Sequence, residues 1–307
     1  MERLQQDASI PVNCIVSMKT DSETKREPSP ITFGCPRFSL GNHYVYVVLS
    51  SRARGLSVGI NLCPEGHCNF QCAYCEAHPP VISPPHEIKL ERLSKELHST
   101  VDLVLTKELR QFPPFEALDD DLFELKQVSI SGNGEPTLSP SFAETIQCIL
   151  HARALGTAPF IKTALLTNGS HLCDQPVRDA IRMLTFDDEI WIKLDAGTQE
   201  YMSRINGGEA SLKTILDNIL SLGKERPVGI QSLFPLFENT APTRTEISAY
   251  IERLKELKES GAQITKVQVY SAGRTARNTS CDHLPLRTLF EICRQIKTET
   301  GLNAEVF

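Results

Sequence analysis

The chain has little aromatic content and no long apolar run. Of its 307 residues only 7% are aromatic, so no aromatic platform for stacking nucleic-acid bases is visible. The longest apolar stretch, Tyr44 to Leu49, has the length of a strand and is far shorter than the roughly 20 residues that cross a bilayer. We therefore expect no membrane span. With 40% hydrophobic and 23% charged residues, the composition also excludes a collagen-like, coiled-coil or wholly disordered chain.

The N-terminus also lacks the features of a secretory signal. The opening residues, MERLQQDASIPVNC, contain no basic segment followed by an apolar one. We therefore place the ten cysteines in a reducing, cytoplasmic compartment, where clustered cysteines more often bind metal or do chemistry than form disulfides. The formal net charge of -6 does not favour a broad phosphate-binding surface.

Residues 1–30 are polar and carry the run KTDSETKREPSP, which predicts a mobile polar leader. We expect residues 31–307 to form one domain that ends near Phe307 with a helix and a short strand, leaving no separate substrate domain. Alternation of β-rich runs with helical spacing predicts strands over 43–50, 56–62, 126–131, 162–169, 189–197, 227–236 and 265–271. It predicts helices over 88–112, 140–156, 176–184, 210–223, 243–261 and 285–301.

Six consecutive strand–helix units predict a parallel sheet, either a partial barrel or an open doubly wound sheet, with an added strand from residues 31–60. Pro113 and Pro114 are expected to end the first helix, and Thr243 with Glu246 forms a capping-box pattern. In either fold a ligand crevice lies at the carboxyl ends of the strands.

Cys68, Cys72 and Cys75 follow the second strand in the spacing C-x3-C-x2-C. Three thiolates on one loop suit a four-iron cluster, in which one iron stays open to a small molecule. The alternative is a zinc site completed by Cys63 or His67, since zinc prefers four ligands. We favour for Cys63 a buried, merely apolar position, and for His67 a polar surface position. A redox role for the Cys72–Cys75 pair is not favoured, because no helix starts there.

The cysteine spacing, with Tyr74 before the last cysteine, resembles the signature of the radical S-adenosylmethionine (SAM) enzymes. The segment GNGEP over 132–136 is similar to the GGEP motif of that family, with Asn133 in place of the second glycine. The resemblance covers about residues 55–307 and implies a partial (β/α)6 barrel of the radical SAM type. The local pattern also resembles a branch related to the wyosine-forming tRNA enzymes.

The resemblance implies that Cys68, Cys72 and Cys75 hold a [4Fe–4S] cluster and that SAM binds the open iron. A reducing partner such as flavodoxin or ferredoxin would supply an electron. SAM would then be cleaved to methionine and a 5′-deoxyadenosyl radical. In oxidoreductase-type chemistry this radical would abstract hydrogen from an unidentified substrate, either a small molecule or one of unknown class. The protein would supply orientation and exclude water.

The resemblance also implies a set of SAM contacts. The Gly132-Asn133-Gly134 turn would approach the methionine moiety, and Glu135 would accept its ammonium group. Tyr74 would lie against the adenine, and the backbone of 270–273 would contact the same ring. Residues proposed for the ribose and carboxylate are Thr167, Asn168, Lys193, Asp195 and Gln231. For Lys193 and Asp195, which share one face of a strand, a structural ion pair is an equally good interpretation.

The remaining reactive residues have plain interpretations. We expect Arg274 and Arg277 in a solvated basic loop, His78 on a polar surface, and Cys148 and Cys293 in the core. Cys14, Cys35, Cys173 and Cys281 are scattered and predict no second cluster. Two alternative functions stay open. One is tRNA modification, which the acidic charge does not favour, and the other is a non-catalytic metal-binding scaffold.

Overall fold

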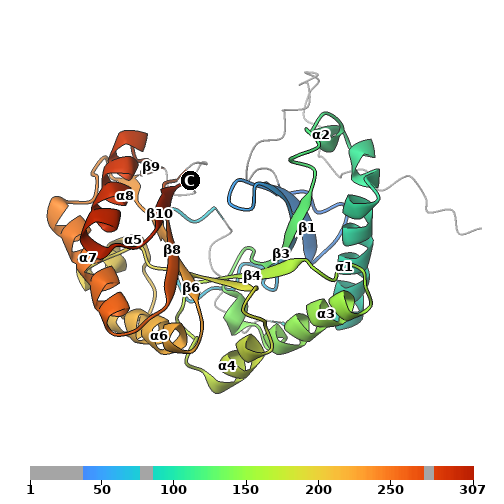
Figure 1. Cartoon of the computed structure of the whole chain (residues 1–307), viewed down its shortest axis with the longest axis horizontal. Helices are drawn as coiled ribbons and strands as arrows, with labels where there is room; N and C mark the ends of the chain where they lie inside the picture. The colour runs from blue at the N-terminus through green and yellow to red at the C-terminus, as the bar shows by residue number, and fades with distance from the viewer. Residues whose placement is uncertain (1–36, 77–85, 273–279) are drawn as a thin grey trace, which may run out of the picture.

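The computed structural model describes residues 37–76, 86–272 and 280–307, which form a curved sheet with helices along its outer side (Figure 1). Its eight strands follow one another in space as they do in the chain. They are β1 (Val45–Ser50), β2 (Gly55–Ile60), β3 (Leu125–Ile130), β4 (Lys162–Thr167), β5 (Glu189–Lys193), β6 (Val228–Leu233), β8 (Ile264–Tyr270) and β10 (Ala304–Val306). The pair β1–β2 is antiparallel, and every later pair is parallel.

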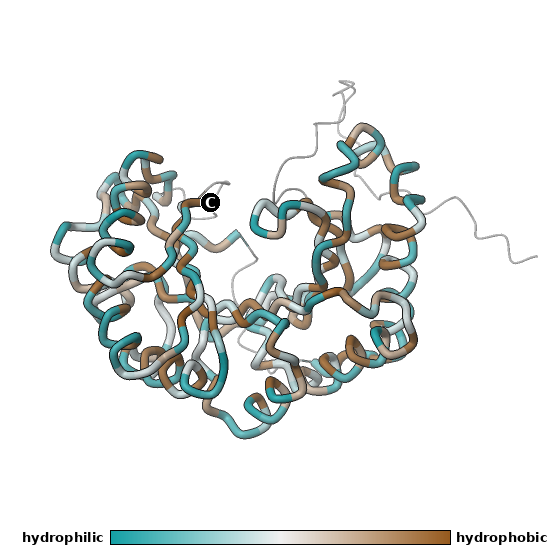
Figure 2. The backbone as a smooth tube through the Cα atoms, viewed as in Figure 1, coloured by the Kyte–Doolittle hydropathy of each residue, from teal (hydrophilic) through white to brown (hydrophobic). Residues whose placement is uncertain are grey.

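The helices between these strands pack on the convex face and leave the concave face uncovered (Figure 1). They are α1 (Leu90–Leu105), α3 (Phe142–Ala154), α4 (Gln175–Arg182), α5 (Gln199–Ile205), α6 (Leu212–Glu225), α7 (Arg244–Glu259) and α8 (Leu286–Thr300). Hydrophobic and hydrophilic residues alternate around them (Figure 2), so each helix buries one apolar side against the sheet. Leu93 and Leu97 of α1, for example, are fully buried in this layer.

This arrangement confirms the partial barrel. A doubly wound sheet would carry helices on both faces, whereas here they cover one. The expected added strand is β1 at the edge of the sheet, and the short final strand is β10. The predicted leader over 1–30, together with Cys35, His78, Gly273, Arg274 and Arg277, lies outside the described residues.

The predicted end of the first helix is wrong. Helix α1 stops at Leu105, where the Thr106 hydroxyl donates to the Asp102 carbonyl at 2.8 Å and Lys107 takes a left-handed conformation (φ 62°). A 3₁₀ turn (Glu108–Gln111) follows. Pro113 then opens the short helix α2 (Pro113–Glu116), because the first helical position needs no N–H donor.

Other boundaries also differ from the prediction. The strand expected over 189–197 ends at Lys193, and the strand expected over 227–236 divides into β6 and β7 (Pro235–Phe237). Strand β7 pairs with β9 (Cys281–His283) in a second, two-stranded sheet, which was not expected, and neither was α5. No helix in the described residues is both long and apolar enough to cross a bilayer.

The capping box at the start of α7 is half formed. The Thr243 hydroxyl accepts from the Glu246 amide at 3.1 Å, as expected. The Glu246 carboxylate instead accepts from the Gly197 amide at 2.5 Å and the Thr198 hydroxyl at 2.6 Å. It therefore ties the start of α7 to the loop that follows β5, close to the carboxyl end of the sheet.

Candidate functional site

The loop that carries the three cysteines follows β2 and rests on the end of α5. The amide of Gln71 donates to the Asn206 carbonyl at 2.8 Å, and the amide of Ala73 donates to the Ile205 carbonyl at 2.7 Å. A side chain at Gly208 would place its Cβ 2.4 Å from the Asn69 carbonyl oxygen. The glycine therefore lets the two backbones meet and fixes the loop over the carboxyl ends of the strands.

The GNGEP turn after β3 packs against the same loop. The Glu135 amide donates to the His67 carbonyl at 3.0 Å, and a Cβ on Gly134 would lie 1.9 Å from that oxygen. The Asn133 side chain, at the position that departs from the family motif, donates to the Pro64 carbonyl at 3.3 Å. The substitution thus adds a contact between the turn and the cysteine loop.

The surroundings of the cysteines fit a cationic metal centre. Burial raises the pKa of the Cys68 thiol to about 12 and that of Cys72 to about 11. The Cys68 sulfur accepts from the Phe70 amide at 3.4 Å, and the Cys72 sulfur accepts from the Asn206 side chain at 3.5 Å. Such N–H donors stabilise iron-bound thiolates, and bound iron would supply the positive charge that these sulfurs lack.

The zinc alternative lacks its ligand set. Cys63 is buried, and its thiol donates to the Glu135 carbonyl at 3.4 Å. In the described part of the chain, no three His, Cys, Asp or Glu side chains are arranged around one ion. Cysteines that each bind a different iron of a cluster need not converge on one point.

Glu135 is a buried carboxylate at the carboxyl end of the sheet. It accepts from the Thr137 and Thr167 hydroxyls and the Asn168 amide, each at 2.6 Å. None of these donors is charged, and burial raises the pKa of Glu135 despite them. Among the described residues it forms no ion pair, so a cationic group in the adjacent cavity would meet an uncompensated acceptor.

Lys193 connects two aromatic side chains beside the cysteine loop. Its Nζ lies 4.9 Å from the ring centroid of Tyr74 and 4.8 Å from that of Tyr270, whose hydroxyl it contacts at 2.8 Å. It also lies 3.1 Å from the Asp195 carboxylate. Burial opposes the charge of Lys193, but Asp195 and Tyr270 outweigh it and raise the pKa.

Asp195 connects the residues around Lys193 by hydrogen bonds. Its carboxylate accepts from the Tyr74 hydroxyl, from the Asn206 side chain at 2.8 Å and from the Leu233 amide at 2.7 Å. The structure thus contains the ion pair that strand spacing allowed. Lys193 faces the cavity, whereas Asp195 does not line it. Asp195 therefore holds Tyr74, Lys193 and Asn206 in place from outside the cavity lining.

All these elements surround one cavity of about 1450 Å³ on the concave face. The residues proposed from the sequence that line it are Cys68, Cys72, Tyr74, Cys75, Gly132, Asn133, Gly134, Glu135, Thr167, Asn168, Lys193 and Gln231. Gln231 donates to the Gln268 side chain at 2.9 Å, deep in the barrel. Parallel strands bring these residues together because their carboxyl ends share one edge of the sheet.

Several residues of the site were missed from the sequence. Asn206 contacts Cys72, Tyr74 and Asp195, and Asn61 accepts from the amides of Cys63 and Asn133. The Asn206-Gly207-Gly208 turn was a signal for the first, and the position of Asn61 directly after β2 was one for the second. Arg37 and Arg52 also line the cavity, and no motif marked them.

Comparison with known proteins finds relatives in sequence and in fold. No family model matches the chain. Two UPF0026 proteins are similar in sequence. One, from Helicobacter pylori strain J99, is 24% identical over 80% of this chain and 73% of its own length. The other, slr1464 from Synechocystis, is 28% identical over 72% of this chain and 74% of its own length.

Among solved structures, a radical SAM methyltransferase from Sphaerobacter thermophilus aligns with a TM-score of 0.59 and 12% identity, covering 87% of this chain and 70% of its own. The chain has the radical SAM fold. TYW1 with a lysine–pyruvate adduct aligns with a TM-score of 0.51 and 18% identity over 83% of this chain and 84% of its own.

Streptococcus suis SuiB, bound to its precursor peptide SuiA, shares the radical SAM fold with a TM-score of 0.56 and 14% identity. The match covers 81% of this chain but only 48% of SuiB, so this chain corresponds to about half of that protein. SuiB has also been solved bound to SAM. At these identities the likeness concerns the fold.

Proposed function

We propose that the chain is a radical SAM enzyme in which Cys68, Cys72 and Cys75 hold a [4Fe–4S] cluster and the adjoining cavity binds SAM. The observation that carries the proposal is the packing of the cysteine loop directly against the GNGEP turn, through the Glu135 amide and the His67 carbonyl at 3.0 Å. When bound, cluster and SAM would supply reductive cleavage to a 5′-deoxyadenosyl radical that takes hydrogen from substrate.

The residues of the chain would bind and orient. Glu135 would accept the ammonium of SAM, since it is buried without a counter-ion. Lys193, held by Asp195, would donate to the SAM carboxylate or ribose, and Tyr74 would present its ring to the adenine. Thr167, Asn168 and Gln231 line the same cavity and are proposed as further polar contacts.

The test is anaerobic reconstitution of the full chain, followed by iron and sulfide analysis and addition of SAM with a strong reductant. We expect about four irons and four sulfides per chain and 5′-deoxyadenosine by mass spectrometry. The triple variant Cys68→Ala/Cys72→Ala/Cys75→Ala should bind no cluster and form no product. The matched control Cys148→Ala/Cys173→Ala, which removes cysteines outside the site, should behave as the wild type.

A wild-type chain that binds one zinc and no iron would contradict this proposal and favour a scaffold. With an intact cluster but no 5′-deoxyadenosine, the usual cleavage would be wrong, and methylthioadenosine would be the next product to look for. Reduced flavodoxin or ferredoxin should replace the chemical reductant. A tRNA substrate predicts a salt-dependent gel shift, and no binding at low salt would exclude it.

A further inference from the structure

The cavity is larger than a single small-molecule site. Small-molecule pockets usually measure about 300–1,000 Å³, whereas this one measures about 1450 Å³. Apart from Gln231 of β6, the residues proposed for SAM lie along the cysteine loop and the ends of β3, β4 and β5. Beyond them the cavity extends over the inner faces of β1, β2, β6 and β8. This second part has room for a substrate beside SAM.

The inner faces of these strands and of β3 carry polar side chains at several positions where parallel barrels usually place Val, Ile and Leu. On one side, the Ser57 hydroxyl donates to Ser129 at 3.2 Å and accepts from Gln127 at 3.4 Å. On the other side, the buried pair Gln231 and Gln268 forms one hydrogen bond at 2.9 Å, which leaves further donors and acceptors on both amides. These groups suit a ligand with several hydroxyls.

An aromatic surface lies between the two polar sides. Trp191 of β5 lines the cavity, and a Cβ on Gly229 of the next strand would lie 2.3 Å from its ring. The glycine therefore lets the indole lie flat against β6. Its Nε1 donates to Glu189 at 2.8 Å, which fixes the ring in that orientation. A flat ring beside hydroxyl-binding side chains suits the C–H face of a polyol or sugar.

Arg52, in the hairpin between β1 and β2, adds a cation at the open edge of the cavity. Its guanidinium carbon lies 4.7 Å from the ring centroid of Tyr270 on β8, so the contact joins the two arms of the curved sheet. Stacking uses the face of a guanidinium and leaves the N–H donors at its edge free. Within the described residues Arg52 forms no ion pair and no hydrogen bond.

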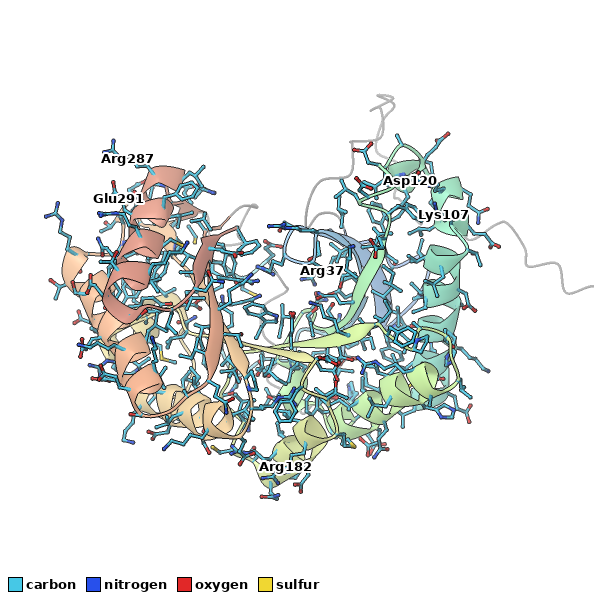
Figure 3. The ribbon with its side chains drawn as sticks, in the orientation of Figure 1. Arg37, Lys107, Asp120, Arg182, Arg287 and Glu291 are labelled. Carbon is cyan, nitrogen blue, oxygen red and sulfur yellow. The ribbon has the colours of Figure 1, made fainter. Side chains whose placement is uncertain are left out.

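The other cavity-lining cations are already engaged. Lys162 pairs with Glu189 at 2.5 Å, Lys266 with Glu305 at 3.1 Å, and Lys193 with Asp195. Arg37 (Figure 3) donates to Asn133 at 3.2 Å and stacks on Tyr46 near the start of β1. Arg52 is therefore the cation best placed to receive an anion from outside the chain.

We propose that the substrate is a hydroxyl-rich small molecule with one anionic group, a carboxylate or a phosphate ester, and that Arg52 binds this group at the mouth of the cavity. This inference rests on the proposed function, because it assigns the space beside SAM to the substrate. The hydroxyl groups would contact Ser57, Gln127 and Gln268, and the carbon skeleton would lie against Trp191.

The test uses Trp191, the single tryptophan of the chain, as an intrinsic fluorescent probe inside the cavity. The full chain is titrated before and after cluster reconstitution with ribose 5-phosphate and with gluconate, and with their neutral counterparts ribose and glucitol. Inorganic phosphate and acetate are included as anions without hydroxyls. We expect at least one anionic polyol to give a saturable change, at least about tenfold tighter than its neutral counterpart.

Arg52→Gln should weaken binding of that probe by about 10- to 100-fold and remove the preference for the anion. The matched control is Arg54→Gln, which removes the same charge two residues away in the same hairpin but outside the cavity lining, and it should bind as the wild type. Comparing the titrations with ribose 5-phosphate and with gluconate shows whether a phosphate or a carboxylate is preferred.

Three outcomes would overturn this inference: neutral polyols that bind as tightly as the anionic ones, unchanged binding in Arg52→Gln, or no saturable change with either anionic probe. The fluorescence readout does not depend on SAM cleavage. A chain that binds the probe but forms no 5′-deoxyadenosine would therefore contradict the proposed function alone, and the reverse result would contradict the substrate class alone.

Discussion

Two buried carboxylates, at opposite ends of the same sheet, differ in how they are compensated. Glu135 lies at the carboxyl end of β3, is 2% exposed and accepts only from neutral groups. Asp188 lies at the amino end of β5, is 3% exposed and forms an ion pair with Arg153. Burial raises the pKa of Glu135. At Asp188 burial acts in the same direction, but hydrogen bonds from Arg153 and the Thr163 amide outweigh it and lower the pKa.

Asp188 and Glu135 are equally buried, but among the described residues only Asp188 has a cationic partner. We therefore expect Asp188 to contribute to stability and Glu135 to ligand binding. Asp188 is satisfied inside the protein, and its bonds to Arg153, Thr163 and Thr185 join α3, β4 and β5. Glu135 has the cavity beside it and no internal cation, so its missing partner would come from a ligand. Parallel barrels commonly place ligand-binding residues at the carboxyl ends of their strands and stabilising residues at the amino ends.

The largest expected effect is on stability at Asp188. Asp188→Asn leaves the partly buried Arg153 guanidinium without its counter-ion, and we expect the free energy of unfolding to fall by about 3 kcal/mol. Chemical denaturation measures this loss. Asp187→Asn, which removes an exposed neighbouring charge, should change stability little. We expect a similar SAM affinity in both variants. A large loss of SAM affinity in Asp188→Asn would contradict the assignment of Asp188 to stability rather than binding.

Glu135→Gln should act on SAM instead. Removing the negative charge deprives the SAM ammonium of its partner, and we expect SAM affinity to fall by about 10- to 100-fold. Equilibrium dialysis on the reconstituted chain measures it. The amide keeps one oxygen acceptor, so the stability loss should stay below about 2 kcal/mol. Glu65→Gln on the cysteine loop is the control, and equal affinity in the two variants would exclude Glu135 as a ligand.

The two carboxylates should also differ in their pH dependence. The pKa of Asp188 is lowered by folding, so its contribution is present above the unfolded value of about 3.9 and is lost as the pH falls towards the lower folded value. The pKa of Glu135 is raised, so its contribution is present below the unfolded value of about 4.3 and is lost as the pH rises through the folded value. The free energy of unfolding, measured by denaturation between acid and neutral pH, should therefore change less with pH in the variants. In Asp188→Asn the slope should fall at the acid end, and in Glu135→Gln it should fall above about pH 4.3.

The smallest expected effect is that of Tyr74→Phe. The variant keeps the ring that faces the cavity and removes the hydroxyl that contacts Asp195 and Asn206. We expect SAM affinity to stay within about threefold of the wild type, because the ring rather than the hydroxyl would contact adenine. Tyr74→Leu should lose more. If Tyr74→Phe lost as much SAM affinity as Tyr74→Leu, the hydrogen bonds of the hydroxyl would matter more for SAM binding than the ring.

Periodic patterns predicted the fold well where burial on one side decides the structure. The parallel strands and the long helices α1, α3, α6, α7 and α8 were each expected, because apolar residues recur at the spacing of a packed face. The predictions were wrong where a single local contact sets the start or end of an element. Pro113 starts a helix rather than ending one, and α5 follows β5 because the Thr198 hydroxyl caps it by accepting from the Tyr201 amide at 3.2 Å.

The site was predictable in part. The motifs identified the cysteines and the GNGEP turn, because local spacing carries that information. They did not identify Asn206, which contacts Cys72 and Asp195 from the end of α5, or Arg52, which reaches Tyr270 across the open edge of the sheet. Both contacts join residues far apart in the chain, and neither belongs to a repeating pattern.

The sequence by itself determined the α/β class of the fold and predicted the kind of centre. The order of strands and helices predicts a parallel sheet, either a partial barrel or a doubly wound sheet, and three cysteines within one short loop suit a cluster with an open iron. Tertiary structure decided which carboxylates are compensated and which are not. Glu135 and Asp188 are both acidic residues next to a strand. Both line the cavity, but the fold places Asp188 against Arg153 and leaves Glu135, among the described residues, with neutral hydrogen-bond donors only.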